Sequence, residues 1–261
     1  MAASVVFIGR DNLFNRRLIH QLSADHLVRL CIFVENDRHS VRGILRRIIN
    51  RIKRYGLFKV LDELAFHIFD RLVLRRQEKE IWRESQFLTP IELSMPTYVT
   101  DNVHDDECLD MIRKLNPDII FSLCCGVIFK KELYNIPKNG TYMLHEGILP
   151  HYRGLHSTLW ALAKDDYENV GATLFRVNDT VDGGEIVLQW KVRDFDGCRN
   201  WGWTAHRGHI DAIPSISKVF QGIAVKPGTE MSQEPDHYYT WMQLSQFLSL
   251  RLRSRLVRWR D

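Results

Sequence analysis

The hydrophobic residues at the start of the chain form a short unbroken run, then a helical repeat, then a second unbroken run. The two runs are Ser4–Gly9 (SVVFIG) and Leu27–Val34 (LVRLCIFV), and apolar residues recur at helical spacing over 13–22 between them. Short runs rich in β-branched residues are typical of buried strands. Strand, helix and strand at this spacing predict a βαβ unit, and therefore a parallel sheet with a right-handed crossover.

A long helical pattern follows the second run. Ile44, Ile48 and Ile52 recur every four residues among arginines, and the helical signal continues to about residue 81. We interpret 41–82 as an inserted helical hairpin. Strand patterns then occupy 96–100, 118–123, 141–145, 172–177 and 185–192, and helical patterns occupy 106–115, 157–163, 203–220 and 241–259. The expected fold class is α/β, with helices on both faces of a mainly parallel sheet.

Composition places the chain among ordinary globular proteins. Of its 261 residues, 45% are hydrophobic and 26% are charged, which excludes a disordered, collagen-like or disulfide-framed protein. No run reaches the roughly 18 apolar residues of a membrane span, and no basic segment with a cleavage site opens the chain.

The cysteines indicate a reducing compartment. Their number, five, is odd, and Cys31, Cys124 and Cys125 lie in apolar runs where thiols act as small hydrophobes. Cys124 and Cys125 are adjacent and lack the spacing of zinc ligands. We therefore expect a cytoplasmic chain with reduced cysteines and no metal site.

Positive charge is concentrated in two segments. The net charge of the chain is +4, but 41–82 holds eleven Lys/Arg and five Asp/Glu, a net of +6, and 250–261 holds five Arg and one Asp, a net of +4. Basic amphipathic helices of this kind lie on anionic membranes. In the alternative interpretation, which we favour for 41–82, the apolar stripe packs on the sheet and the arginines face water. The C-terminal segment leaves the same two alternatives open.

Chemistry-bearing residues follow two of the predicted strands. His145 ends the strand at 141–145, and Asp182 precedes two glycines in TVDGGEIV, just before the strand at 185–192. Ligands of open α/β sheets bind beyond the carboxyl ends of strands. We therefore expect the two side chains to meet there, within hydrogen-bond reach directly or through one water. Alone, a histidine at a strand end or an Asp-Gly-Gly turn is commonly structural.

Together with their neighbours, these residues resemble a known family. The ordered set comprises His145, Leu149-Pro150, Tyr152-Arg153-Gly154, Trp160-Ala161-Leu162, Gly171 and Asp182-Gly183-Gly184. It closely resembles the folate-dependent formyltransferases, which include enzymes acting on methionyl-tRNA, glycinamide ribonucleotide and nucleotide-linked amino sugars. The resemblance covers about 116–192 and implies a Rossmann-like domain that takes a formyl group from N10-formyltetrahydrofolate. We assign 1–193 to this domain, with the insertion 41–82, and 194–261 to a mainly helical C-terminal extension.

The resemblance also implies catalytic roles, with one departure. The catalytic trio of the family is Asn, His and Asp; His145 and Asp182 match it, but Met143 occupies the Asn position. The Asn amide and the His stabilise the oxyanion that forms when an amine attacks the formyl carbon, and a thioether cannot donate that hydrogen bond. Asp182 would orient His145 and accept the proton shed by the amine, and His145 would pass a proton to the leaving nitrogen of folate.

The resemblance places further residues around the two substrates. The segment CGVIF matches the pterin-binding segment of the family, and a flat pterin needs an apolar slot rimmed by backbone groups. The expected folate-binding residues are Cys125, Gly126, Val127, Ile128, Phe129 and Val181. The expected acceptor-binding residues are Arg10, as a phosphate partner near a helix N-terminus, and Arg153. A packed strand-to-helix link and a solvated loop arginine are the structural alternatives for CGVIF and Arg10.

Several functions stay open. The leading hypothesis is formyl transfer to the amine of a small biosynthetic intermediate, such as a nucleotide-linked amino sugar. Because Met143 replaces Asn, the alternatives are hydrolysis of 10-formyltetrahydrofolate, transfer to a non-amine acceptor, and a non-catalytic relative that binds a ligand or a membrane. We expect no nucleic-acid partner, because 194–261 does not suit a tRNA-binding β-barrel. The insertion is expected to serve acceptor binding, homodimer contacts or membrane association without forming the folate pocket.

Overall fold

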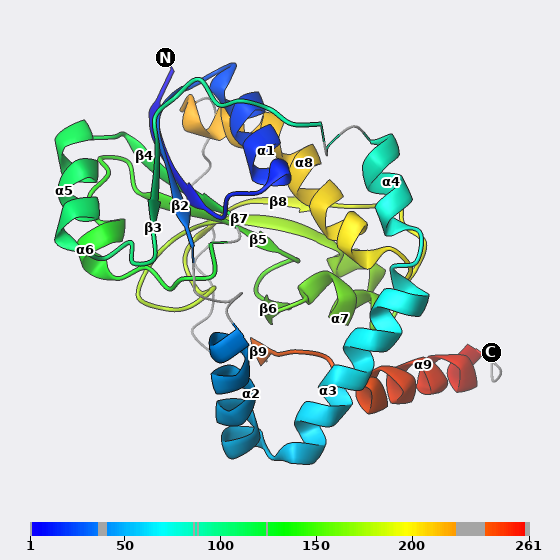
Figure 1. Cartoon of the computed structure of the whole chain (residues 1–261). Helices are drawn as coiled ribbons and strands as arrows, with labels where there is room; N and C mark the ends of the chain where they lie inside the picture. The colour runs from blue at the N-terminus through cyan, green and yellow to red at the C-terminus, as the bar shows by residue number, and fades with distance from the viewer. Residues whose placement is uncertain are drawn as a thin grey trace.

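A single seven-stranded sheet runs through the computed structural model, which describes residues 2–35, 41–85, 87, 89–123, 125–222 and 238–258 (Figure 1). The strand order is β3-β2-β1-β4-β5-β7-β8. The strands are β1 (Ser4–Gly9), β2 (Leu27–Val34), β3 (Thr97–Thr100), β4 (Ile119–Leu123), β5 (Thr141–Glu146), β7 (Gly171–Arg176) and β8 (Ile186–Lys191). The first five strands in this order, β3, β2, β1, β4 and β5, pair in parallel with their neighbours. Strand β7 pairs antiparallel with both β5 and β8. The predicted α/β fold with a mainly parallel sheet is confirmed.

Helices cover both faces of this sheet. Helices α1 (Leu13–Ser23) and α8 (Trp201–Phe220) pack on one face, and α5 (Asp106–Leu115) and α6 (Lys131–Tyr134) pack on the other. Neighbouring residues of β1 point to opposite faces, so Phe7 joins the first layer of the core and Ile8 the second. Helix α8 lies in the segment that we placed in the C-terminal extension, and its Ile213 and Ile216 belong to the same core as the sheet.

The order of the strands creates a crevice for ligands. Gly9 pairs with Leu123, and Leu123 pairs with Leu144, so β1, β4 and β5 end at one edge of the sheet. The chain passes from β1 to one side for β2 and β3, and to the other side for β4 and β5. Such a switch point leaves the loops after β1 and β4 splayed apart, and ligands of open α/β sheets bind there.

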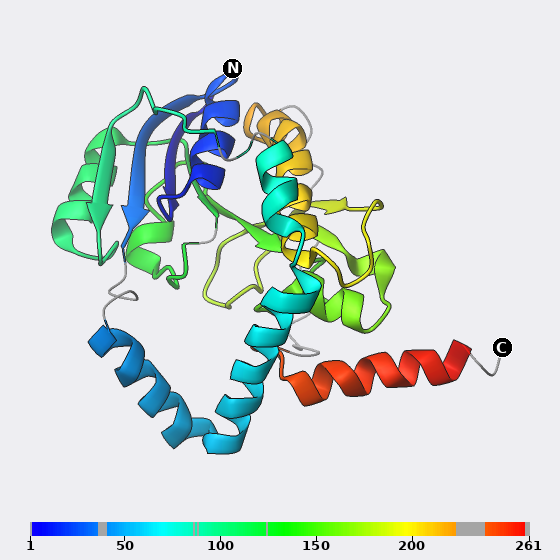
Figure 2. The same ribbon diagram turned by 45° about the vertical axis from the view of Figure 1, so that its right-hand side comes forward.

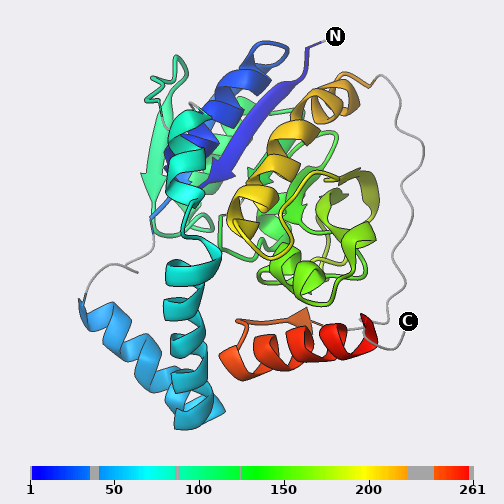
Figure 3. The same ribbon diagram turned by 90° about the vertical axis from the view of Figure 1, so that its right-hand side faces the viewer.

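The insertion is helical, as predicted, but its apolar stripe does not pack on the sheet. It comprises α2 (Val41–Tyr55), α3 (Leu57–Phe69), the π-helix η1 (Asp70–Leu74) and α4 (Glu78–Glu84). Figures 2 and 3 show α2 and α3 standing away from the sheet as a V. Leu45, Ile48 and Ile49 are all exposed. The packed interpretation was therefore wrong for α2, because α1, α8, α5 and α6 already cover the two faces of the sheet. We refer to 41–69 as the helical arm.

The C-terminal segment returns to the body of the protein at two places. Strand β9 (Tyr238–Tyr239) pairs with β6 (Arg153–Gly154) in a small separate sheet that the sequence did not predict. Helix α9 (Leu244–Arg258) then packs against α3 and α7 (Ser157–Ala163). The predicted terminal helix is confirmed.

Cys124 lies outside the described residues, and Cys31, Cys108 and Cys125 are buried. Among the described residues, no helix has the length and apolar character needed to cross a membrane.

Candidate active site

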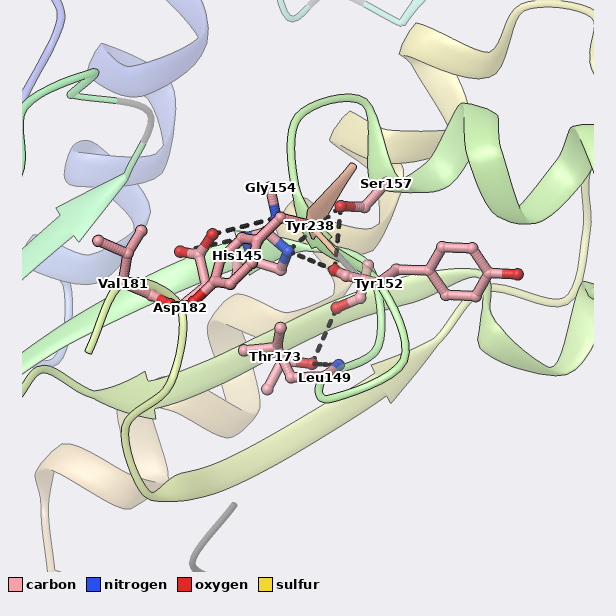
Figure 4. Close-up of polar contacts among 10 residues, drawn as sticks. His145, Leu149, Tyr152, Gly154, Ser157, Thr173, Val181, Asp182 and Tyr238 are labelled. Atoms are coloured by element: carbon pink, nitrogen blue, oxygen red, sulfur yellow. Dashed lines mark hydrogen bonds and ion pairs between the residues drawn. The ribbon is translucent and has the colours of Figure 1, made fainter. Parts of the chain in front are cut away.

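His145 lies near the carboxyl end of β5 and is buried, with 8% of its surface exposed. Its ring contacts the loop that follows the strand. Its Nε2 lies 2.8 Å from the carbonyl oxygen of Tyr152 (Figure 4). A carbonyl can only accept a hydrogen bond, so Nε2 carries the hydrogen and donates it. Nδ1 then faces Asp182, whose Oδ1 is 3.7 Å away. The two predicted residues meet at the sheet edge, at ion-pair distance and without a direct hydrogen bond.

Asp182 belongs to the loop between β7 and β8, where its backbone is left-handed with φ +48°. Its Oδ2 accepts a hydrogen bond from the backbone N–H of Gly154, at 3.1 Å. The carboxylate therefore bridges Gly154 and the His145 ring. Gly184 makes the sharp return to β8 possible, because a Cβ there would lie 1.7 Å from the carbonyl oxygen of Arg176.

The loop that carries Asp182 is anchored from two sides. Tyr238 of β9 donates its hydroxyl hydrogen to the carbonyl oxygen of Val181, at 2.6 Å. On the other side, Asp179 accepts a hydrogen bond from Tyr134 at 2.6 Å and pairs with Lys131 at 2.7 Å. These contacts fix the backbone that leads into Asp182, which a catalytic carboxylate needs.

Two hydroxyl groups support the loop after His145. Ser157 Oγ lies 3.1 Å from the Tyr152 carbonyl oxygen and 3.3 Å from His145 Nε2. Thr173 of β7 donates to the Gly147 carbonyl oxygen at 2.8 Å and accepts the Leu149 N–H at 3.1 Å. Sequence reasoning missed Ser157, Thr173 and Tyr238, because such contacts join segments whose pairing has no local signal.

An apolar cavity opens beside Asp182. It is lined by Val127, Ile128, Phe129, Met143, Phe175, Val177, Asn178, Asp179, Thr180, Val181 and Asp182. Its volume is about 90 Å³, so it can take part of a ligand while the rest extends outward. Apolar side chains with loop backbone at the rim fit a flat heteroaromatic ring such as a pterin. Four predicted folate-binding residues line this cavity: Val127, Ile128, Phe129 and Val181.

The other two residues of that prediction are placed differently. Cys125 is buried, its Sγ donates to the Val127 carbonyl oxygen at 3.4 Å, and burial raises the pKa of its thiol. Gly126 is exposed with φ +70°. Neither lines the cavity, so both shape the segment that presents Val127 and Phe129.

A second, larger cavity of about 690 Å³ lies at the start of α1. Its lining comprises Asn12, Leu13, Phe14, Arg71, Arg75, Arg76, Glu78, Lys79, Trp82 and His206. Six of these residues come from the insertion, and no residue of the insertion lines the cavity beside Asp182. The Asn12 side chain caps α1 by accepting the Asn15 N–H at 2.8 Å. Arg75 is paired with Glu78, which also lines the cavity, so Arg71, Arg76 and Lys79 with the helix N-terminus make the cavity suited to an anion.

The predicted acceptor contacts do not line this second cavity. Arg153 is 1% exposed and lies in β6. Arg10 is half-buried, and its charge acts to lower the pKa of Cys125, which places it near the 125–129 segment. The cations that line the cavity come instead from the insertion.

Two titratable groups close to His145, His209 and Glu146, have shifted pKa values. Burial lowers the pKa of His209 to about 3, and the nearby His206 and His145 lower it further. Burial also raises the pKa of the Glu146 carboxyl, against the effect of the Thr158 N–H that donates to it at 3.0 Å.

Comparisons with known proteins show what the chain is similar to. The model of the formyl transferase family matches residues 4–196. The chain is 31% identical over 136 residues to the bifunctional polymyxin resistance protein ArnA of Wigglesworthia glossinidia brevipalpis, covering 52% of this chain and 20% of that protein. It is 34% identical over 102 residues to the methionyl-tRNA formyltransferase of Clostridioides difficile, covering 39% of this chain and 33% of that enzyme.

A solved structure shows the same fold. The sugar N-formyltransferase from a Shewanella species superimposes with a TM-score of 0.54 at 14% identity, covering 91% of this chain and 76% of that one. The chain thus has the fold of that protein, while its sequence matches span a third or less of the length of the two curated relatives.

Proposed function

The chain belongs to the formyl transferase family, and from this premise we propose that it transfers a formyl group from N10-formyltetrahydrofolate to the amine of a small biosynthetic intermediate. One observation carries the proposal: His145 and Asp182 face each other at 3.7 Å beside an apolar cavity at the end of β5. Acyl transfer to an amine needs a proton acceptor beside the reacting carbon, and this pair can supply one.

The hydrogen bonds assign a role to each nitrogen and oxygen. Bound in the apolar cavity, the folate supplies the formyl group. Because Nε2 of His145 is committed to the Tyr152 carbonyl, Nδ1 is the nitrogen that exchanges a proton. Asp182 keeps one oxygen on the Gly154 N–H, and its other oxygen, facing Nδ1, accepts the proton that the amine loses. The pair then holds a proton that Nδ1 can return to the leaving nitrogen.

Met143 leaves the cavity without the amide donor that the family places at this position. Among the residues that line the cavity, Asn178 has the one amide side chain. Its Oδ1 accepts the Thr180 N–H at 2.8 Å, so its NH₂ group keeps both hydrogens for another partner. We assign to Asn178 the part of the missing donor, acting on the formyl oxygen directly or through water.

The second cavity supports an acceptor that carries phosphate. Arg71, Arg76 and Lys79 are exposed at its wall, and the positive end of α1 points into the same space. Trp82 offers a flat apolar surface for a ring. A nucleotide-linked amino sugar combines a ring, phosphate groups and an amine, and therefore fits this lining. Because Arg153 is buried, we assign it to the support of Gly154 rather than to the acceptor.

Hydrolysis of 10-formyltetrahydrofolate is the second candidate, and the replacement of Asn by Met143 favours it. Without the amide hydrogen bond to the formyl oxygen, attack by an amine would be slower. Water could enter beside the partly exposed Asp182 and attack instead. We place either reaction in the cytoplasm, which the unpaired state of Cys31, Cys108, Cys125 and Cys198 supports.

The two candidates are separated by following the labelled formyl group of N10-formyltetrahydrofolate with a panel of nucleotide-linked and simple amines. The proposal expects labelled amide with at least one phosphate-bearing amine, in excess of labelled formate. Formate release that exceeds amide formation with every amine would favour the hydrolase.

The acceptor cavity has its own test. Replacing Arg71 and Arg76 by alanine should raise KM for a phosphate-bearing amine about tenfold or more and leave KM for the folate unchanged. Arg83→Ala is the matched control, because Arg83 is exposed on α4 and does not line the cavity. An equal rise in KM for the control would show that the second cavity is not the acceptor site.

A further inference from the structure

The helical arm exposes an apolar stripe that a protein in water would normally bury. Leu57, Leu61, Leu64 and Ile68 recur at helical spacing along one side of α3, and each is about half exposed. Phe58 beside them is 88% exposed. Contiguous exposed apolar surface of this kind marks an interaction site rather than an accident of packing.

The stripe is one side of a helix whose other side is firmly attached to the body. Phe66 is 1% exposed and lies with its ring centre 5.6 Å from that of Phe247 in α9. Asp62 accepts hydrogen bonds from the backbone N–H and the hydroxyl of Ser245. Figures 2 and 3 show α9 on one side of α3, and on the other side α2, which diverges from α3 along the V. The arm is therefore held in a fixed position with its stripe outward.

The second helix of the arm adds positive charge to this surface. Helix α2 contains no acidic residue, and its Arg46, Lys53 and Arg54 are exposed beside the exposed Leu45 and Ile49.

The two acidic side chains of α3 have partners of their own. Glu63 is buried in an ion pair with Arg51, and Asp62 accepts hydrogen bonds from Ser245 of α9, on the side of α3 that faces the body. The outward surface of the arm is thus apolar and positive at once.

We propose that the helical arm docks the protein on an anionic membrane surface. The exposed leucines and phenylalanine would enter the boundary between headgroups and acyl chains, and the cations would meet lipid phosphates. A second copy of this chain would bring like charges together. A nucleic acid would satisfy the cations and leave the apolar stripe in water. This docking is independent of the chemistry at His145.

The proposal is tested with full-length protein and vesicles of phosphatidylcholine, alone or mixed with phosphatidylglycerol. The wild type should sediment with the mixed vesicles, more weakly at raised salt, and not with the neutral ones. The charge variant Arg46→Glu/Lys53→Glu/Arg54→Glu should lose about a hundredfold in partitioning. Its control, Arg29→Glu/Lys114→Glu/Lys218→Glu, reverses three exposed cations outside the arm and should bind much more tightly than the charge variant.

The apolar stripe has its own variant. Leu61→Ser/Leu64→Ser/Ile68→Ser should lose at least about tenfold in partitioning, because three partly inserted side chains are removed. Leu27→Ser/Val99→Ser alters similarly exposed apolar residues on β2 and β3 and should bind like the wild type. All these residues are at least partly exposed, so thermal unfolding and formyl transfer in solution should match the wild type and show intact folds.

A positional probe completes the test. Because the chain already holds seven tryptophans, quenching by brominated lipid is compared with the wild type: it should be stronger for Phe58→Trp and unchanged for Val99→Trp. Three results would overturn the proposal: no sedimentation with anionic vesicles, equal sedimentation of the wild type and both arm variants, or a wild type that self-associates through the arm while ignoring vesicles. Sedimentation velocity of the same variants detects the last of these.

Discussion

Helices α8 and α3 both carry apolar residues at helical spacing, yet the protein uses them in opposite ways. In α8, Ile213 and Ile216 are buried against the sheet that positions the catalytic edge. In α3, Leu61 and Leu64 face outward on an arm that stands off from the same sheet. The spacing of apolar residues predicts that each segment forms a helix. Whether the apolar side of that helix is buried depends on whether a face of the sheet is still uncovered. The excess of positive charge in the arm is the sequence feature that distinguishes α3 and its neighbour α2 from α8.

The sharpest way to break this comparison is to remove the same side chain from each region. Leu174→Ala in the core should cost about 2 to 5 kcal/mol of unfolding free energy, because it leaves a cavity among buried residues. Leu61→Ala in the arm should cost about 1 kcal/mol or less, since about half of that residue is already exposed to water. Urea unfolding of both variants measures the difference. A cost for Leu61→Ala close to that of Leu174→Ala would mean that the stripe is covered in solution.

A second change sharpens the account of the catalytic edge. Met143→Asn restores an amide donor to the cavity and should raise amine formylation, up to about 10²-fold, the scale of one oxyanion hydrogen bond. The measurement is kcat for formyl transfer beside formate release. Met111→Asn, a partly buried methionine of the same core layer, serves as the control. If the protein is a hydrolase, the Met143 variant gains nothing and loses about 1 to 3 kcal/mol of stability through a buried unsatisfied amide.

The third change concerns the anchor of the Asp182 loop. Tyr238→Phe removes the hydrogen bond to the Val181 carbonyl, worth about 0.5 to 1.5 kcal/mol net, and should lower kcat two- to tenfold with little change in KM for the acceptor. Tyr142→Phe removes a comparable hydrogen bond to the Asn139 carbonyl, away from the loop, and should leave kcat unchanged. Equal kcat values for wild type and both variants would show that Tyr238 does not position Asp182.

Much of the fold was predictable from short-range patterns. Apolar runs predict the strands, and apolar repeats predict the helices that pack on the sheet. The approach of His145 to Asp182 follows from the position of both residues near strand ends and from the two glycines after Asp182. The pairing of Arg153 with Tyr238 was not predictable, because strands of two residues far apart in the chain have no local signal.

The fate of the apolar stripe could not be predicted for a different reason. A helix that packs on a sheet and a helix that awaits a partner have the same period. The sequence showed that the insertion is rich in cations, but not which surface each cation belongs to. In the fold, Arg71, Arg76 and Lys79 line the second cavity, whereas Arg46 and its neighbours lie on the arm.

The smallest expected effect is a dependence of stability on pH. The pKa of His209 is about 3 in the folded chain, below its ordinary 6.5. Between these values the unfolded chain binds more protons at this site, so His209 alone lowers stability by about 1 kcal/mol as pH drops from 6.5 to 5.5; the lowered pKa values of His156 and His206 act in the same direction. Urea unfolding at the two pH values should show this fall in the wild type. His209→Gln should reduce the slope, whereas His20→Gln, at an exposed site, should not; equal slopes for all three proteins would contradict this assignment.

One measurement tests most directly that the chemistry resides at the sheet edge and not in the arm. Formyl transfer to a phosphate-bearing amine is compared for Asp182→Asn, the exposed control Asp194→Asn, and Leu61→Ser/Leu64→Ser/Ile68→Ser. We predict that kcat/KM falls by about 10²- to 10⁴-fold for Asp182→Asn alone, the range for loss of a general base, while the other two variants keep the activity of the wild type. Wild-type activity in Asp182→Asn, or a comparable loss in the arm variant, would contradict the account.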